Sequence, residues 1–278
     1  MSFAELKQIL DGRELQTMDE IVTERSEGIL RVELNRPEKK NALTSSMYAK
    51  LADIFNDAGK DDSVRVVLWH GAGDAFSAGN DIQDFLKNPP GAGESPQARL
   101  MNALADFGKP IVAAVRGAAI GSGTTVLLHC DFVYAGESTR FQMPFINLAV
   151  VPEFGSSYAV PAAIGHIRAA ELILLGSAFD ARRAAELGLV TQVVLDENLL
   201  PVASETARKL AAKPAGALQA SKRLLKRSFR EQVKAAMRAE NEAFSVHVRS
   251  EEAKEALTAF LEKRPPDFTK TRKPAAAA

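Results

Sequence analysis

The sequence contains a single cysteine, Cys130, and no stretch that approaches about 18 unbroken apolar residues. One cysteine excludes an intramolecular disulfide and fits a reducing compartment. The lack of a long apolar run argues against a membrane span. Residues 1–7 also lack a basic segment followed by an apolar core, which argues against a secretory signal. We therefore expect a cytoplasmic protein with no membrane partner.

An excess of charge is also absent. Lys plus Arg and Asp plus Glu both number 35, so the formal net charge is zero, and electrostatics gives no reason to expect a nucleic acid partner. The sequence has no Walker motif, no GxGxxG motif and no metal-ligand spacing among its four histidines. We therefore expect no metal and no bound nucleotide cofactor, although a small polyanionic ligand needs only a local basic patch.

Strands and helices alternate through the first two-thirds of the chain. This alternation predicts an α/β fold with mostly parallel strand pairing. The predicted strands are 21–23, 29–34, 64–69, 111–115 and 131–135, and a helix capped by Thr44 runs to about residue 58. Helix-forming residues then dominate, with predicted helices at 199–212, 215–227, 230–247 and 251–261. We expect a core at 19–198, a helical region at 199–268 and peripheral tails at 1–18 and 269–278.

Two glycine-rich turns each follow a predicted strand. They are Ser77-Ala78-Gly79-Asn80-Asp81 and Gly121-Ser122-Gly123. Small side chains let a ligand approach the backbone closely. The second turn also opens a helix, whose first N–H groups and dipole favour a developing negative charge. Each turn alone is typical of ordinary turns, but together they indicate backbone N–H groups available to a ligand.

Segments around both turns resemble the crotonase (enoyl-CoA hydratase/isomerase) superfamily. Residues 76–82 resemble its first oxyanion-hole segment, and residues 114–123 with 130–135 resemble the second. Arg36-Pro37 with residues 40–43 resembles its coenzyme A-binding start, and residues 256–264 resemble its C-terminal signature. The resemblance runs in order from about residue 20 to 268, which makes it specific for the superfamily.

The resemblance implies an α/β crotonase-like spiral of ββα units with a helical C-terminal trimerisation region. It implies a coenzyme A thioester substrate, no further cofactor, and self-association as a trimer or a dimer of trimers. The backbone N–H groups of Ala78 and Ser122 would hold the thioester oxygen and stabilise an enolate; each such donor contributes on the order of 10²–10³ in rate. The other substrate-binding residues that the resemblance implies are Lys40, Ala42, Asp81, Ile82, Phe145, Phe260 and Lys263.

The base decides which reaction of the superfamily the protein catalyses. The two glutamates that activate water in the hydratases fall at Thr125 and Phe145 here, and neither residue can serve. Glu153, in Pro152-Glu153-Phe154-Gly155-Ser156-Ser157, resembles the single acid/base of peroxisomal-type Δ3,Δ2-enoyl-CoA isomerases, with Phe154 in place of a small residue. Apolar neighbours would raise the pKa of Glu153. Without the resemblance, the sequence favours a structural interpretation of Glu153, as a carboxylate at a helix start.

The preferred interpretation is thus a Δ3,Δ2-enoyl-CoA isomerase in which Glu153 moves a proton from C2 to C4. An enoyl-CoA hydratase, or another acyl-CoA reaction of the superfamily, is the alternative. A protein of another class, a non-catalytic acyl-CoA or RNA binder, stays open, and the zero net charge weighs against RNA.

Other polar residues have structural interpretations. We expect Asp81 to hold its turn through side-chain-to-backbone hydrogen bonds, and His70 and His129 to be structural, with His129 buried. We expect residues 221–227 to form a solvated helix face. The Pro- and Gly-rich segment 88–96 has the composition of a mobile lid edge.

Overall fold

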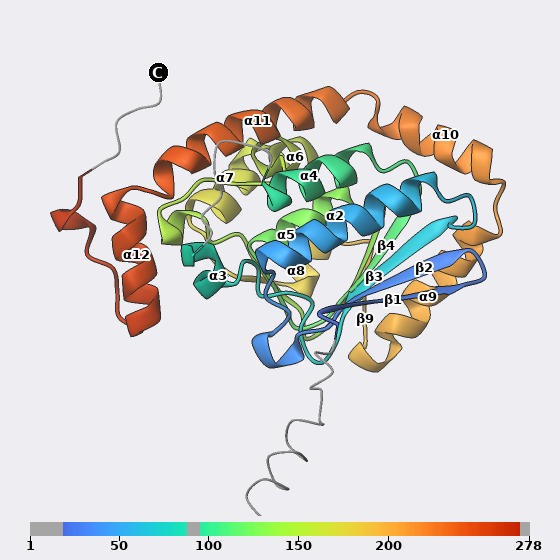
Figure 1. Cartoon of the computed structure of the whole chain (residues 1–278), viewed down its shortest axis with the longest axis horizontal. Coiled ribbons are helices and arrows are strands. Elements are labelled where there is room, and N and C mark those ends of the chain that lie inside the picture. Colours follow the sequence, from blue (N-terminus) through green and yellow to red (C-terminus); the bar gives the residue numbers. More distant parts are fainter. Residues whose placement is uncertain (1–18, 88–94, 273–278) are drawn as a thin grey trace, which may run out of the picture.

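The computed structural model describes residues 19–87 and 95–272 (Figure 1). The predicted tail 1–18, residues 273–278 and most of the predicted lid edge at 88–96 lie outside the described residues. In the described part of the chain, no helix combines the length and the apolar character that crossing a membrane requires.

The main sheet has six strands in the order β1 (Ile21–Ser26), β2 (Ile29–Leu34), β3 (Val66–Gly71), β4 (Ile111–Val115), β6 (Phe132–Gly136) and β9 (Gln192–Val194). Within this sheet of the described residues, β1 and β2 alone pair antiparallel, and the other neighbours are parallel. A second sheet contains β5 (Ala118–Ile120), β7 (Arg140–Gln142) and β8 (Phe179–Asp180). The predicted α/β fold with mostly parallel pairing is therefore confirmed.

Helices cover the sheet and continue into the C-terminal region (Figure 1). The α-helices are α2 (Ser45–Lys60), α3 (Ile82–Lys87), α4 (Pro96–Asp106), α5 (Ser122–Thr125), α6 (Ser156–Ile164), α7 (His166–Leu174), α8 (Ala181–Glu186), α9 (Leu199–Ala211), α10 (Ala215–Lys226), α11 (Arg230–His247) and α12 (Glu251–Glu262). Short 3₁₀ helices are η1 (Pro37–Lys39), η2 (Val126–His129), η3 (Ile146–Leu148), η4 (Asp196–Asn198) and η5 (Phe268–Lys270). The four predicted C-terminal helices are confirmed within one residue at each end.

Alternation along the central strands places the core on both faces of the sheet. In β3, Val67 and Trp69 belong to the large core that includes α2 and α4, whereas Val66 and Leu68 pack with α9 on the other face. A strand buried on both faces reads as a continuous apolar run, as this one does. Because β3 and β4 are parallel neighbours, their carboxyl ends lie at one edge of the sheet, and both glycine-rich turns follow from there.

Candidate active site

Backbone hydrogen bonds join the two glycine-rich turns. The Ser77 N–H donates to the Ala118 carbonyl over 3.0 Å, and the Ile120 N–H donates to the Ser77 carbonyl over 2.9 Å. Gly79 lies against the second turn with φ +83°, and a Cβ there would lie 2.5 Å from the carbonyl oxygen of Ile120. Only glycine meets both conditions, because left-handed backbone and missing space each exclude a side chain. The contact holds the turns in register.

The free backbone donors differ from the prediction at one position. The N–H of Ala78 donates to the carbonyl of Lys40 over 2.9 Å, so the prediction that Ala78 holds a substrate oxygen is wrong in this geometry. The next residue, Asn80, is the alternative donor. The Leu43 N–H donates to the Gly79 carbonyl, and the Asp81 N–H donates to the Leu43 carbonyl. The N–H of Asn80, which lies between Gly79 and Asp81, therefore points away from Leu43. Among the described residues, neither the Asn80 N–H nor the Ser122 N–H has an acceptor.

Tyr48 of α2 holds the Asn80 side chain. Its hydroxyl donates to Asn80 Oδ1 over 2.5 Å, and the ring is buried. Burial raises the pKa of Tyr48 well above its ordinary value, and the charge of Glu153 adds to that effect. The phenol therefore stays protonated and can only donate to Asn80, which orients this residue in the first turn. No motif in the sequence marked Tyr48 as a residue of the site.

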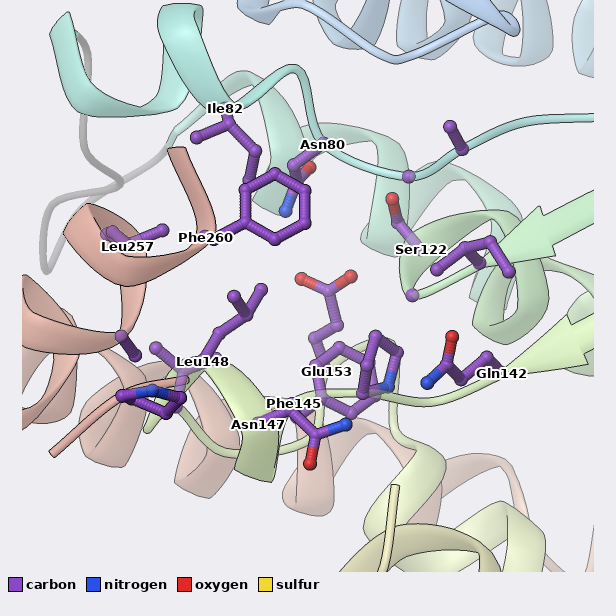
Figure 2. A pocket seen from close by; sticks show the side chains of 18 of the residues that line it. Asn80, Ile82, Ser122, Gln142, Phe145, Asn147, Leu148, Glu153, Leu257 and Phe260 are labelled. Atoms are coloured by element: carbon purple, nitrogen blue, oxygen red, sulfur yellow. The ribbon is translucent and has the colours of Figure 1, made fainter. Parts of the chain in front are cut away.

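A mostly apolar cavity of about 340 Å³ opens beside the two turns (Figure 2). Its wall includes residues of both turns, of the segment 142–153 and of the C-terminal helices. The lining residues are Ala78, Gly79, Asn80, Ile82, Ile120, Gly121, Ser122, Gln142, Pro144, Phe145, Asn147, Leu148, Val150, Glu153, Phe244, Ala256, Leu257, Phe260, Arg264 and Pro266. Glu153 is the one carboxylate among these described lining residues, and its head group points into the cavity in Figure 2.

The Glu153 carboxylate is buried and only half partnered. The residue is 3% exposed. Its Oε2 accepts a hydrogen bond of 2.5 Å from Nε2 of Gln97, in the first turn of α4. Its Oε1 has no hydrogen-bond partner among the described residues. Burial raises the pKa of Glu153 to about 8, Gln97 opposes this rise, and the negative charge of Glu240 adds to it. The predicted rise in pKa is confirmed, with burial as its main cause.

Glu153 is carried by a tight turn that leads into α6. Phe154 has φ +59° and Gly155 has φ +73°, and a left-handed non-glycine residue costs on the order of 1–2 kcal/mol. The Phe154 ring is fully buried in the core and forms no part of the cavity wall. Nε2 of His129 lies 2.9 Å from the Phe154 carbonyl. Because that carbonyl can only accept, His129 donates as a neutral ring, and burial lowers its pKa to about 4.

Six of the predicted site residues line the cavity, and four do not. Ala78, Ile82, Ser122, Phe145, Glu153 and Phe260 line it, whereas Lys40, Ala42, Asp81 and Lys263 do not. The Asp81 carboxylate accepts from the Gln83 and Asp84 N–H groups and from Arg36. It holds its own turn as expected, which leaves its predicted contact with substrate without support.

The two positions expected to hold hydratase glutamates offer no acid or base. Thr125 is fully buried, and its hydroxyl donates to the Gly121 carbonyl over 3.3 Å. Phe145 presents its ring to the cavity (Figure 2). The arrangement thus supplies two free N–H donors, one protonatable carboxylate and an apolar wall. Such a site can stabilise an enolate and move one proton.

Residues 221–227 differ from the predicted solvated face at Lys222. Lys222 is 5% exposed, and its ammonium donates to Asp131 Oδ2 and to the Lys109 carbonyl, each over 2.6 Å. Asp131 Oδ2 also accepts from the Ile111 N–H at the start of β4. The cluster ties α10 to the sheet. This cluster could not be predicted from the sequence, because Lys222 and Asp131 lie far apart in the chain.

Comparison with known proteins identifies the family. The sequence profile described as "Enoyl-CoA hydratase/isomerase" matches residues 24–271. The chain is 35% identical to 1,2-epoxyphenylacetyl-CoA isomerase of Escherichia coli K12, over 91% of this chain and 99% of that protein. It is 33% identical to enoyl-CoA delta isomerase 2 of Rattus norvegicus, over 92% of this chain and 66% of that protein. A solved enoyl-CoA hydratase/isomerase from Pseudoalteromonas atlantica T6c superposes with a TM-score of 0.86 at 40% identity, covering 90% of this chain and 99% of that one. The chain belongs to the enoyl-CoA hydratase/isomerase family, with the crotonase fold.

Proposed function

We propose that the protein is a Δ3,Δ2-enoyl-CoA isomerase. The observation that carries the proposal is Glu153: among the described residues it is the one carboxylate on the wall of a mostly apolar cavity, and one of its oxygens has no hydrogen-bond partner there. Isomerisation needs one group that takes a proton and returns it. Hydration needs acid/base groups that activate water, and Thr125 and Phe145 supply none. The similarity to a delta isomerase is in keeping with the proposal.

In the proposed reaction, ionised Glu153 removes a proton from C2 of a 3-enoyl thioester. The electron pair moves into the thioester carbonyl, whose oxygen accepts hydrogen bonds from the Asn80 and Ser122 N–H groups. Protonated Glu153 then returns the proton to C4, and the double bond shifts to C2–C3. One proton leaves and one returns, so the proposed step uses no metal or redox cofactor. A pKa of about 8 lets Glu153 both accept and release that proton near neutral pH.

The Ser122 donor belongs to the start of α5, and the Asn80 donor to a turn fixed by Tyr48 and Gly79. Both are therefore preorganised before substrate binds, which is what makes backbone donors effective toward a developing oxyanion. The proposal has two further parts. Phe260 and Lys263 contact the coenzyme A moiety of the substrate, and the protein self-associates as a trimer or a dimer of trimers.

A substrate panel tests the proposal. Isomerisation of trans-3-enoyl-CoA raises the absorbance of the conjugated thioester, whereas hydration of trans-2-enoyl-CoA lowers it. We expect the rise and not the fall, and we expect Glu153→Gln to abolish it. Fast loss of conjugation with the 2-enoyl substrate would indicate the alternative hydratase. Tight acyl-CoA binding without turnover across the panel would indicate a binding protein.

A further inference from the structure

Glu240 is a second buried carboxylate close to the active-site turn, outside the cavity. It lies on α11 with the buried residues Val233, Met237 and Phe244 on the same helix face, and it is 5% exposed. Its Oε2 accepts from the Gly155 N–H and its Oε1 accepts from the Ser157 N–H, each over 2.7 Å. Both oxygens thus bind the backbone that directly follows Glu153.

These two hydrogen bonds replace a local helix cap. The N-cap of α6 is Gly155, which has no side chain with which to satisfy the first-turn N–H groups. The Ser156 N–H donates to the Glu153 carbonyl over 3.1 Å, and Glu240 accepts from the N–H groups on either side. A carboxylate 85 positions along the chain therefore performs the capping that a residue at the helix start usually performs.

The same contacts restrain the turn that carries Glu153. Gly155 packs so closely on α11 that a Cβ would lie 2.8 Å from Val233 Cγ1. The adjacent Phe154 has left-handed backbone, which persists only when neighbouring contacts hold it. Glu240 fixes the turn from α11, and His129 fixes it through the Phe154 carbonyl.

Glu240 also changes the electrostatic surroundings of Glu153. The start of a helix presents free N–H groups and the positive end of the helix dipole, which stabilise a nearby anion. Left unoccupied, the start of α6 would stabilise ionised Glu153. With Glu240 bound, those N–H groups serve another carboxylate, and its negative charge raises the pKa of Glu153.

We propose that Glu240 is a positioning residue for Glu153: it holds the turn at residues 153–155 and prevents the start of α6 from stabilising the ionised Glu153 carboxylate. The inference rests on the proposed acid/base role of Glu153. The other polar groups that face this region are Tyr48 from α2, Gln97 from α4, neutral His129 from η2 and Arg264 on the cavity wall. Glu240 differs from these groups because it binds two backbone N–H groups of the turn, one with each carboxylate oxygen.

Glu240→Gln tests the proposal, because it keeps the side-chain size and one acceptor but removes the charge. We expect the rising limb of kcat/KM against pH to move to lower pH by roughly half a unit. We expect kcat on the plateau to fall roughly tenfold, since a loosened turn misplaces the base, while KM stays within about twofold. Glu242→Gln is the matched control: it removes a charge from an exposed residue of the same helix and should leave both quantities unchanged.

A spectroscopic titration separates this proposal from the proposed function. The infrared band of protonated Glu153, assigned as the band that Glu153→Gln lacks, is followed against pH in wild type and Glu240→Gln. A lower midpoint in Glu240→Gln is expected, and an equal or higher midpoint overturns the role of Glu240 whatever the enzyme's activity. Full turnover by Glu153→Gln would instead overturn the proposed function. Glu240→Asp keeps the charge on a shorter side chain. We therefore expect a lower kcat, with the rising limb of kcat/KM against pH near its wild-type position. This variant tests the role of Glu240 if Glu240→Gln does not fold.

Discussion

Two carboxylates, one partly exposed at Asp131 and one buried at Glu153, lie in different surroundings in this molecule. Asp131 Oδ2 meets the Lys222 ammonium over 2.6 Å and accepts the Ile111 N–H. Among the residues that the structure describes, the Glu153 carboxylate accepts a hydrogen bond only from the neutral amide of Gln97, and its other oxygen, on the cavity wall, has no partner. Asp131 and Lys222 offset each other's charge in an ion pair, whereas the unpaired and buried carboxylate of Glu153 changes its ionisation state near neutral pH. The comparison separates a cluster that holds the fold from a residue poised to move a proton.

The largest expected effect is on turnover when the unpaired carboxylate is removed. Glu153→Gln should lower kcat for trans-3-enoyl-CoA by roughly 10³-fold, because general acid–base groups contribute about 10²–10⁴. Binding of a saturated acyl-CoA, measured by calorimetry, should stay near the wild-type value. Loss of binding together with turnover would mean that the substitution acts on the shape of the cavity and not on proton transfer.

A second change separates the two glycine-rich turns without touching Glu153. Gly79→Ala forces a Cβ against the Ile120 carbonyl in left-handed backbone. It should displace the Asn80 N–H and lower kcat by about 10²-fold, the typical contribution of one oxyanion donor. Gly108→Ala is the control, because nothing lies within 4 Å of the added Cβ. Equal rates in the two variants would remove the first turn from the proposed mechanism.

The unpaired carboxylate should also make stability depend on pH. The pKa of Glu153 is raised from 4.5 to about 8 in the fold, so the folded chain binds this proton more tightly than the unfolded chain. Its contribution to stability is therefore full below about pH 4.5 and is lost as pH rises through about 8. In urea unfolding, the free energy of unfolding of Glu153→Gln should therefore rise relative to that of wild type across this range, by on the order of 5 kcal/mol. A difference that is constant with pH would contradict the raised pKa.

A substitution in the Lys222–Asp131 ion pair should have the opposite effect: it should lower stability and leave turnover nearly unchanged. Lys222→Met removes the ammonium that donates to Asp131 and to the Lys109 carbonyl, and it should lower the free energy of unfolding by about 2 kcal/mol. The turnover of the folded fraction should stay within about twofold. Lys209→Met, which removes an exposed partner of Glu205, should change stability by less than about 0.5 kcal/mol.

The smallest expected effect concerns the hydrogen bond from Gln97, the one that the Glu153 carboxylate accepts among the described residues. Gln97→Leu removes a donor that lowers the pKa of this carboxylate. The rising limb of kcat/KM should therefore move to higher pH by roughly one unit, the equivalent of one hydrogen bond to a charged group. A shift to lower pH, or no shift, would show that Gln97 does not set the proton affinity of Glu153.

Local patterns in the sequence predicted much of the fold and part of the site. Periodicity and breaks located the four C-terminal helices, and Thr44 caps α2 by accepting from the Met47 N–H as expected. Glu153 and Ser122 were identified as site residues because the short motifs around them resemble those of the crotonase superfamily. Each of these features depends on residues that are neighbours in the chain, so a short stretch of sequence is enough to predict it.

The remaining features depend on partners that are distant in the chain. Whether Ala78 or Asn80 presents a free N–H depends on the Lys40 carbonyl, which takes the Ala78 donor. Gln97 and Glu240 meet the Glu153 turn across 56 and 85 positions. Lys222 was predicted to be solvated because its helix is rich in basic residues. Its partner, Asp131, lies 91 positions away in the chain and could not be identified from the sequence. Only the tertiary structure brings these residues together.

The most direct test of the central claim follows one proton through a single turnover. A trans-3-enoyl-CoA labelled with deuterium at C2 is converted in ordinary water, and the product is examined by mass spectrometry and NMR for label at C4. A buried single base predicts that part of the deuterium removed from C2 appears at C4. A C4 position that carries only solvent hydrogen, with turnover intact, would contradict the shuttle by Glu153.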